Sequence, residues 1–454
     1  MSNTFSRLRG SKLVRGGLVV GAGILLGNIT GFFRVAVTAY LLGTHAGADA
    51  LAVAMGPFDA LNSVLVNTML FAFAPMLMLW HGSDRSALFA RAGRVFTIVL
   101  AAMSALIAIF ASPLAEFLGP GLAPAQHAQV VTLLRLFAPA TLFAGASAIY
   151  GALLYTERRF LVPVLYQTCL NGATIVAAIA LWRVLGVNGF AIGYSAGAAI
   201  QLLISWWFSR DLSRIPRSGL HLSAAHVLSK PGMFLTYSVL ISANIAATRI
   251  FATQGGSGMA AAFDYCLRCV SVVIAYLVYP VSTTLVPEVA RLRGTNRSTD
   301  AYRLIDRSVW LMAGGAALCW GLGVLVRTPI IALLFQRGSF TAESTRLVSG
   351  VFLGFAPCIF GASLMDLIVR CFFAMDRPRL PLVAAFIPIS INLAVSSILR
   401  ATGRLSDPVM LGMGASIGLA AGFAVLFTLI HFGRDATLTA GEKAYSTYSA
   451  TIVE

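Results

Sequence analysis

Long apolar stretches separated by short polar ones recur along the whole chain. Each is long enough to cross a bilayer as a helix, because a span needs about 20 predominantly apolar residues. The apolar positions are continuous rather than alternating, which favours helices over the strands of a closed barrel. The pattern predicts an all-α polytopic membrane protein with about twelve transmembrane helices. The expected spans are 17–43, 49–80, 89–111, 130–155, 163–186, 188–209, 232–254, 263–288, 303–327, 346–374, 381–400 and 408–432.

Charge is scarce and unevenly distributed. Of the 454 residues, 58% are hydrophobic and 11% are charged, whereas soluble domains carry about 25% charged residues. The net charge of +16 is concentrated in alternate loops. Under the positive-inside rule these loops, the N-terminal segment 1–16 and the tail 433–454 are cytoplasmic. This distribution accounts for the basic balance without nucleic acid as a partner.

A glycine pattern indicates an internal repeat of six helices. The sequence G-x-x-I-G-x-x-A-G begins at Gly189 in the sixth expected span and again at Gly414 in the twelfth. Glycines four apart share a helix face and let a neighbouring backbone approach closely. Because six is an even number, the two halves share one orientation. We expect a six-helix N-terminal lobe at 17–209, a cytoplasmic connection at 210–231 and a six-helix C-terminal lobe at 232–432.

A second repeated feature is the spacing of charged residues. Arg34 precedes Asp49 by 15 residues, and Arg249 precedes Asp264 by the same distance. Each aspartate opens the span that follows its arginine. Parallel repeats of this kind are one plan of transporter folds, in which the substrate lies between the halves.

The few charges inside the expected spans are candidates for function, because charged groups are costly in lipid and usually face a polar cavity. Arg34 lies about 14 Å of helical rise from the nearer end of its span, too deep to reach the interface easily, which favours a cavity role. Arg249 and Arg370 lie nearer the ends, so their side chains have the alternative of extending to the interface. Asp59 and Asp366 have two alternatives, a proton or ion site and a hydrogen bond to neighbours.

Arg268 carries its own alternative, a structural ion pair with Asp264 one helical turn earlier. Taken together, the deep charges are mostly cationic, which favours an anionic ligand. Arginine suits phosphate because its planar fork gives paired, charge-assisted hydrogen bonds and stays protonated. The sequence therefore favours a transporter of a phosphorylated lipid.

Catalytic and metal-binding motifs are missing from the sequence. It contains no H-E-x-x-H and no P-loop, so we expect a transporter rather than an enzyme, with no cofactor. Cys266 and Cys269 form a C-x-x-C without a second pair or a histidine cluster, and we expect no metal there. An ion gradient, the membrane potential and the substrate's own gradient all remain open as the source of energy.

Several motifs resemble those of the MurJ (MviN) lipid II flippases. The stretch "GNITGFFRVAVTAYLLGTHAGADALAVA" is similar to the first-helix signature of that family, and "FAFAPML" to its second-helix region. "AAFDYCLRCVSVVIAYLVYPVSTTLVPEVARL" keeps the family's spacing between Arg268 and Pro287. "LLFQRGSFTAEST" resembles its F-x-x-G-x-F-T motif, and "FFAMDRPRLP" its turn after the tenth helix. The resemblance covers about 17–430.

The resemblance implies the fold of the multidrug/oligosaccharidyl-lipid/polysaccharide (MOP) exporter superfamily, with two six-helix lobes around a V-shaped central cavity and alternating access. It implies a multi-pass location in the bacterial inner membrane and roles in peptidoglycan biosynthesis, cell-wall biogenesis and cell shape. The implied substrate is lipid II, an undecaprenyl-diphosphate-linked saccharide moved to the outer leaflet, with envelope-synthesis enzymes as possible partners. The implied diphosphate ligands are Arg34, Arg268 and Arg249. Supporting or gating roles fall to Asp49, Asp264, Asn28 and Asp59.

The chain also departs from the family pattern. Asn28 and Val35 stand where the family usually has an arginine and an acid, and Leu61 and Asn62 stand where it has paired arginines. Many members have about two further C-terminal helices, so the resemblance is to a shortened, divergent member. These differences keep a second substrate open, another lipid-linked glycan such as an exopolysaccharide repeat unit. The further alternatives are a drug/cation antiporter of the same superfamily, a membrane glycosyltransferase, and a non-transporting envelope scaffold.

Overall fold

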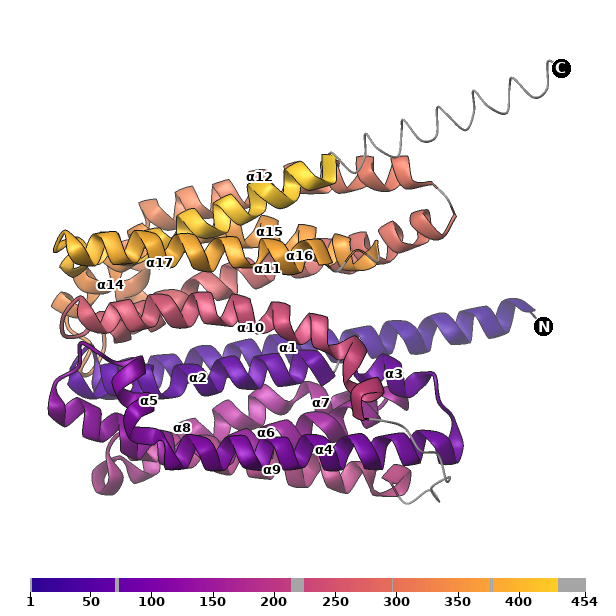
Figure 1. Cartoon of the computed structure of the whole chain (residues 1–454), viewed down its shortest axis with the longest axis horizontal. Helices are drawn as coiled ribbons and strands as arrows, with labels where there is room; N and C mark the ends of the chain where they lie inside the picture. The colour runs from indigo at the N-terminus through magenta and orange to yellow at the C-terminus, as the bar shows by residue number, and fades with distance from the viewer. Residues whose placement is uncertain are drawn as a thin grey trace, which may run out of the picture. The chain divides into compact units, whose positions relative to one another are not determined.

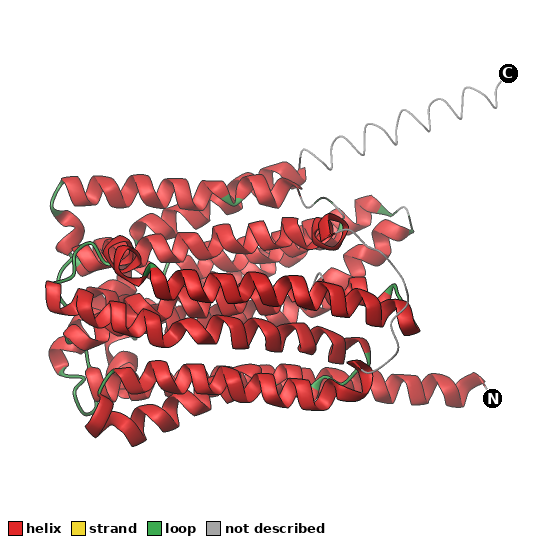
Figure 2. Cartoon of the chain, turned by 60° about the horizontal axis from the view of Figure 1, so that its bottom comes forward, coloured by secondary structure: helices red, strands yellow, loops and turns green. Residues whose placement is uncertain are grey.

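The computed structural model describes residues 2–69, 73–213, 224–295, 297–375, 377 and 379–431. Regular structure within these ranges is helical (Figure 2). Eleven helices are long and apolar enough to cross a membrane, and a bent pair, Ala342–Phe355 with Cys358–Ala374, brings the described spans to twelve. The prediction of about twelve helical spans is confirmed. The expected tail 433–454 and part of the expected connection 210–231 lie outside the described residues.

Short loops connect the helices of the first half of the chain (Figure 1). They are α1 (Ser2–Leu42), α2 (Ala46–Thr68), α3 (Ala74–Met78), α4 (Gly82–Ile109), α5 (Ala111–Leu118), α6 (Pro124–Thr156), α7 (Leu161–Val164), α8 (Tyr166–Leu185) and α9 (Asn188–Ser213). The expected N-terminal segment 1–16 is continuous with the first span, because α1 already begins at Ser2.

The second half of the chain also consists of consecutive helices. Its helices are α10 (Ala224–Gln254), α11 (Met259–Gly294), α12 (Ser298–Leu325), α13 (Arg327–Phe335), α14 (Ala342–Phe355), α15 (Cys358–Ala374), α16 (Arg379–Ala384), α17 (Phe386–Ala401), the 3₁₀ turn η2 (Arg404–Ser406), α18 (Pro408–Leu411) and a final helix at 413–431.

Several expected spans contain a helix break, among them 49–80 and 346–374. The expected span 49–80 contains α2 and the separate helix α3. The expected span 346–374 contains α14 and α15, which meet at an angle of 46°. Pro357 lies at this break as the residue before α15. A proline there has no N–H to donate and its ring clashes with the preceding turn, which explains the bend.

The chain divides into two compact units. Unit 1 comprises Met1–Val239, Gly256–Ala262 and Leu333–Thr345, and unit 2 comprises Leu240–Gly255, Phe263–Ala332 and Arg346–Glu454. Two short segments from the second half of the chain therefore pack within unit 1. The exact lobe boundaries expected from the sequence stay a prediction.

The glycine pattern brings neighbouring helices into close contact within each unit. A Cβ atom at Gly193 of α9 would lie 2.8 Å from the Ala173 carbonyl oxygen of α8. In unit 2, a Cβ at Gly418 of the final helix would lie 2.5 Å from the Pro388 carbonyl oxygen of α17. Each glycine face therefore packs against the helix before it, as the spacing predicted.

The loop between α13 and α14 binds the end of α1 within unit 1. The Ser339 N–H donates to the Tyr40 carbonyl at 2.9 Å, and the Thr44 and Ser344 hydroxyls are 2.8 Å apart. Gly43 and Gly338 both have positive φ, at 57° and 60°. Glycine adopts this backbone conformation at little cost, which places the two turns back to back.

Substituting alanine for Gly338 is expected to destabilise the protein by more than 2 kcal/mol. The change adds backbone strain of about 1–2 kcal/mol and places a Cβ 2.5 Å from the Tyr40 carbonyl oxygen. Gly82→Ala is the matched control, because Gly82 also has positive φ but nothing within 4 Å of an added Cβ. The midpoint of thermal unfolding of the purified variants checks this. Equal losses for both would show that the contact with α1 contributes nothing.

Candidate functional site

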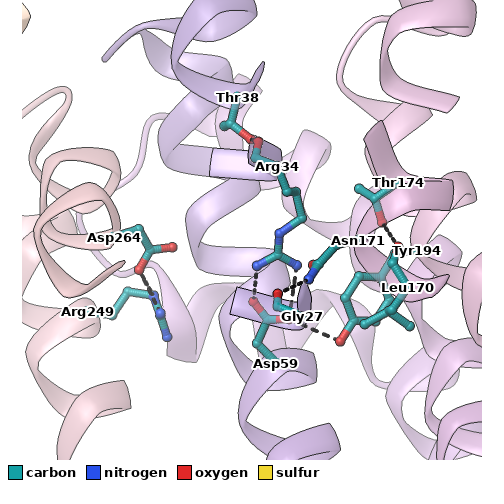
Figure 3. Close-up of polar contacts among 10 residues, drawn as sticks. All are labelled: Gly27, Arg34, Thr38, Asp59, Leu170, Asn171, Thr174, Tyr194, Arg249 and Asp264. Carbon is teal, nitrogen blue, oxygen red and sulfur yellow. Dashed lines mark hydrogen bonds and ion pairs between the residues drawn. The ribbon is translucent and has the colours of Figure 1, made fainter. Parts of the chain in front are cut away.

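An ion pair joins the first two helices of unit 1. Arg34 of α1 donates from Nη1 to Asp59 Oδ1 at 3.2 Å and from Nη2 to Asp59 Oδ2 at 2.7 Å (Figure 3). The Arg34 side chain is 13% exposed and the Asp59 side chain 40%. This two-point geometry is the strong form of an arginine–carboxylate contact. The deep arginine is therefore neutralised by a carboxylate on the next helix.

A buried tyrosine supports the carboxylate from a third helix. Tyr194 of α9 donates its hydroxyl to Asp59 Oδ1 at 3.1 Å (Figure 3). Its ring meets Phe137 edge-on with centroids 5.4 Å apart, and Phe137 stacks on Phe58 at 5.2 Å. Tyr194 is 1% exposed, so packing fixes the position of its hydroxyl. We call Arg34, Asp59 and Tyr194 the Arg34 network.

The helix that carries Arg34 is closely packed on α8. A Cβ at Gly27, seven residues before Arg34, would lie 2.8 Å from the Gln167 side-chain oxygen. The Asn171 amide donates to the Gly27 carbonyl at 3.4 Å (Figure 3). Asn28, the next residue on α1, is half-buried. These contacts hold α1 against α8 about two helical turns before Arg34.

A second ion pair lies in unit 2. Arg249 of α10 donates from Nε at 2.9 Å and from Nη2 at 2.7 Å to Oδ1 of Asp264 on α11. The side chains are 10% and 28% exposed. Arg249 is thus buried in protein rather than extended toward a bilayer surface. Arg268 is half-buried one turn after Asp264, and the alternative pair along α11 stays a prediction.

The two 15-residue pairs are used differently. Asp49 is 2% exposed and accepts from the Gly258 N–H at 2.6 Å and the Ala261 N–H at 3.0 Å. Gly258 directly precedes α11 and Ala261 lies in its first turn, where N–H groups have no partner within the helix. Asp49 therefore acts as a helix cap, whereas Asp264 binds an arginine. The two aspartates that share the 15-residue spacing therefore make different described contacts.

The remaining deep charges in the described ranges also form a pair. Arg370 donates to Asp366 at 3.1 Å through both Nε and Nη2 and lies over the Tyr279 ring, 5.4 Å from its centroid. Of the two alternatives for Asp366, an ion site and a hydrogen bond to a neighbour, the structure describes the hydrogen bond, with Arg370 as the donor. In the described part of the chain, no group of three or more histidine, cysteine, aspartate or glutamate side chains is arranged to hold a metal ion.

A family model described as lipid II flippase MurJ matches residues 38–453. The chain belongs to this family. It is 26% identical to a probable lipid II flippase MurJ of Rhizobium meliloti, over 94% of this chain and 83% of that protein. It is 25% identical to the lipid II flippase MurJ of Burkholderia cenocepacia, over 89% and 82% of the two chains.

Solved structures show the fold. A structure of the lipid II flippase MurJ in an inward closed conformation has a TM-score of 0.79 at 19% identity, covering 91% of this chain and 87% of that one. An inward-facing multidrug MATE-family transporter of the MOP superfamily has a TM-score of 0.69 at 12% identity, covering 90% and 95%. The expected superfamily fold and the expected class, a transporter rather than an enzyme, are confirmed. MurJ family membership implies a multi-span inner-membrane protein, and the orientation of the termini stays a prediction.

Two features of the Arg34 network were not predicted from the sequence. Asp59 was a candidate, but nothing in a separation of 25 residues identified it as the partner of Arg34. Tyr194 was missed, although it follows Gly193 as a polar aromatic side chain on a helix face of small residues. A hydroxyl on such a face needs a hydrogen-bond partner when buried, and that was the available signal.

Proposed function

We propose that this MurJ-family chain translocates lipid II from the cytoplasmic to the outer leaflet by alternating access. The observation that carries the proposal is Arg34, a permanent cation deep in a spanning helix that is 13% exposed and held in a fixed orientation. Such a residue is expensive in a membrane and indicates an anion pathway. The names of the relatives supply the identity of the anionic lipid.

The chemical task fits arginine. Lipid II carries a diphosphate that must leave the aqueous boundary, while its polyprenyl chain stays in the bilayer. A guanidinium fork offers the diphosphate paired hydrogen bonds and a compensating charge within a low-dielectric setting. In this proposal Arg34 binds the diphosphate, and Arg249 and Arg268 bind it at another stage of the cycle. No cofactor takes part, and an ion gradient, the membrane potential or the substrate's own gradient supplies the energy.

One observation favours a second candidate substrate. Asn28, Val35, Leu61 and Asn62 stand where the family pattern has charged residues. These departures from the family pattern suit another polyprenyl-diphosphate saccharide, such as an exopolysaccharide repeat unit, which keeps the diphosphate proposed to bind Arg34 but carries different sugars. The choice between the two rests on the sugar, so the test must use lipid II itself.

Complementation tests the proposal. A bacterial strain depleted of its own lipid II flippase is expected to grow and to expose lipid II at the outer leaflet when it produces this chain. Immunoblots of the membrane fraction establish that the protein is present at the level of a functional relative. Failure at normal protein levels would reject lipid II as the substrate and favour another lipid-linked glycan.

A further inference from the structure

We propose that Asp59 is an internal counterion that occupies Arg34 when no substrate is bound, and that the substrate's diphosphate displaces it onto Tyr194. This inference rests on the proposed function, because it assumes that Arg34 receives the diphosphate. In this inference, Asp59 and Tyr194 set the affinity of Arg34 for an anion.

The geometry of the ion pair makes Asp59 a competitor. Its two oxygens bind Nη1 and Nη2 of Arg34 at 3.2 and 2.7 Å. A phosphate group can form a paired contact with the same two nitrogens, Nη1 and Nη2. A diphosphate that binds there must replace the carboxylate. Arg249 differs, because it presents Nε and Nη2 to a single oxygen of Asp264.

Exposure allows the exchange. Asp59 is 40% exposed at its side chain, whereas Arg34 is 13% exposed. The carboxylate therefore has room to move while the guanidinium stays fixed by the protein around it. The pair also explains how Arg34 is tolerated in a membrane without substrate, because an unpaired buried charge is strongly unfavourable.

Tyr194 gives the displaced carboxylate a place to bind. Its hydroxyl already donates to Asp59 Oδ1 at 3.1 Å, and the ring is fixed by its contact with Phe137. Once the diphosphate binds Arg34, the Tyr194 hydroxyl still donates to Asp59. The hydroxyl donates to a carboxylate in both states, but in the released state the Arg34 guanidinium no longer offsets the negative charge, so the carboxylate is the stronger acceptor. Tyr194 therefore stabilises the released state more than the paired state and acts as a positioning residue through Asp59.

Binding of inorganic pyrophosphate to the purified full-length protein tests these roles. Asp59→Asn removes the competing charge and is expected to tighten binding about tenfold or more. Tyr194→Phe removes the hydroxyl that receives the carboxylate and is expected to weaken binding about threefold or more. In the Asp59→Asn background, Tyr194→Phe is expected to change nothing, because its effect passes through the carboxylate. Asp366→Asn is the matched control, since it also removes an aspartate from an arginine pair but leaves the Arg34 network intact.

The outcomes separate this inference from the proposed function. Arg34→Ala is expected to abolish the pyrophosphate binding that the other variants modulate. If Arg34→Ala binds pyrophosphate like the wild type, the assignment of Arg34 fails and the proposed function loses its support. If Arg34→Ala loses binding while Asp59→Asn binds no tighter, the site stands and the counterion role is wrong. A Tyr194→Phe effect that persists without the Asp59 carboxylate would overturn the role assigned to Tyr194.

Discussion

Arg34→Ala is expected to abolish lipid II translocation while leaving the protein in the membrane. The substitution removes the cation proposed to bind the diphosphate, and alanine offers neither charge nor hydrogen bond in its place. A span as apolar as Val19–Leu42 still inserts without the arginine. The variant is measured in the flippase-depleted strain, by growth and by lipid II at the outer leaflet, at a membrane level equal to that of the wild type.

Two controls isolate the role of the arginine. Arg34→Ala leaves the Asp59 carboxylate without its bidentate partner, so Arg34→Ala/Asp59→Asn removes both charges and is expected to remain inactive. Arg404→Ala removes an exposed arginine from η2 and is expected to be fully active. Translocation at the wild-type rate by the double variant would mean that Arg34 served only to balance Asp59.

Asp264→Ala is expected to lower the free energy of unfolding by about 3–5 kcal/mol. Removing one partner of a buried ion pair leaves the other charge uncompensated, and Arg249 is 10% exposed at its side chain. Arg249→Met/Asp264→Ala removes both charges and is expected to recover much of the loss, because buried pairs are often replaceable by apolar residues. The midpoint of thermal unfolding in one detergent checks both variants.

An exposed pair supplies the comparison for Asp264→Ala. Arg297 and Asp300 form an ion pair with side chains 60% and 38% exposed, and pairs of this kind contribute about 1 kcal/mol or less. Asp300→Ala is therefore expected to change stability little. Equal effects of Asp264→Ala and Asp300→Ala would contradict the view that Arg249 depends on its carboxylate.

Hydropathy predicted the spans because lipid imposes a simple requirement on length and composition. It did not predict where helices break. Pro357 marks one break between α14 and α15, yet Pro57 lies inside the continuous helix α2. A proline alone therefore did not reveal which helix would bend, because packing around the break decides whether the freed carbonyl finds a partner.

The sequence predicted which residues are candidates for the site, but it did not predict which of them contact one another. The depth of Arg34 and Arg249 identified both as candidates. The 15-residue spacing indicated a repeat but did not predict that Arg249 pairs with Asp264. The structure joins those two residues, whereas its described hydrogen bonds join Arg34 to Asp59 and Asp49 to the start of α11. Which of two acids on one helix meets an arginine depends on the rotation of the helices about their axes, and sequence spacing does not give that rotation.

The pairing also changes the view of charge within the spans. The sequence alone showed an excess of deep cations, which favoured an anionic ligand. In the structure Arg34, Arg249 and Arg370 each bind an aspartate. In this account, the binding of an anion at these three arginines therefore requires exchange with a bound carboxylate, as proposed for Arg34.

The most direct test of the account is translocation of lipid II by the purified protein in sealed vesicles. Lipid II is placed in one leaflet and its appearance in the other is measured, for the wild type and for Arg34→Ala in parallel. The account predicts that the wild type moves lipid II and that Arg34→Ala moves it no faster than protein-free vesicles. Equal movement by the two proteins, or movement by neither while another polyprenyl-diphosphate glycan is carried by the wild type, would contradict it.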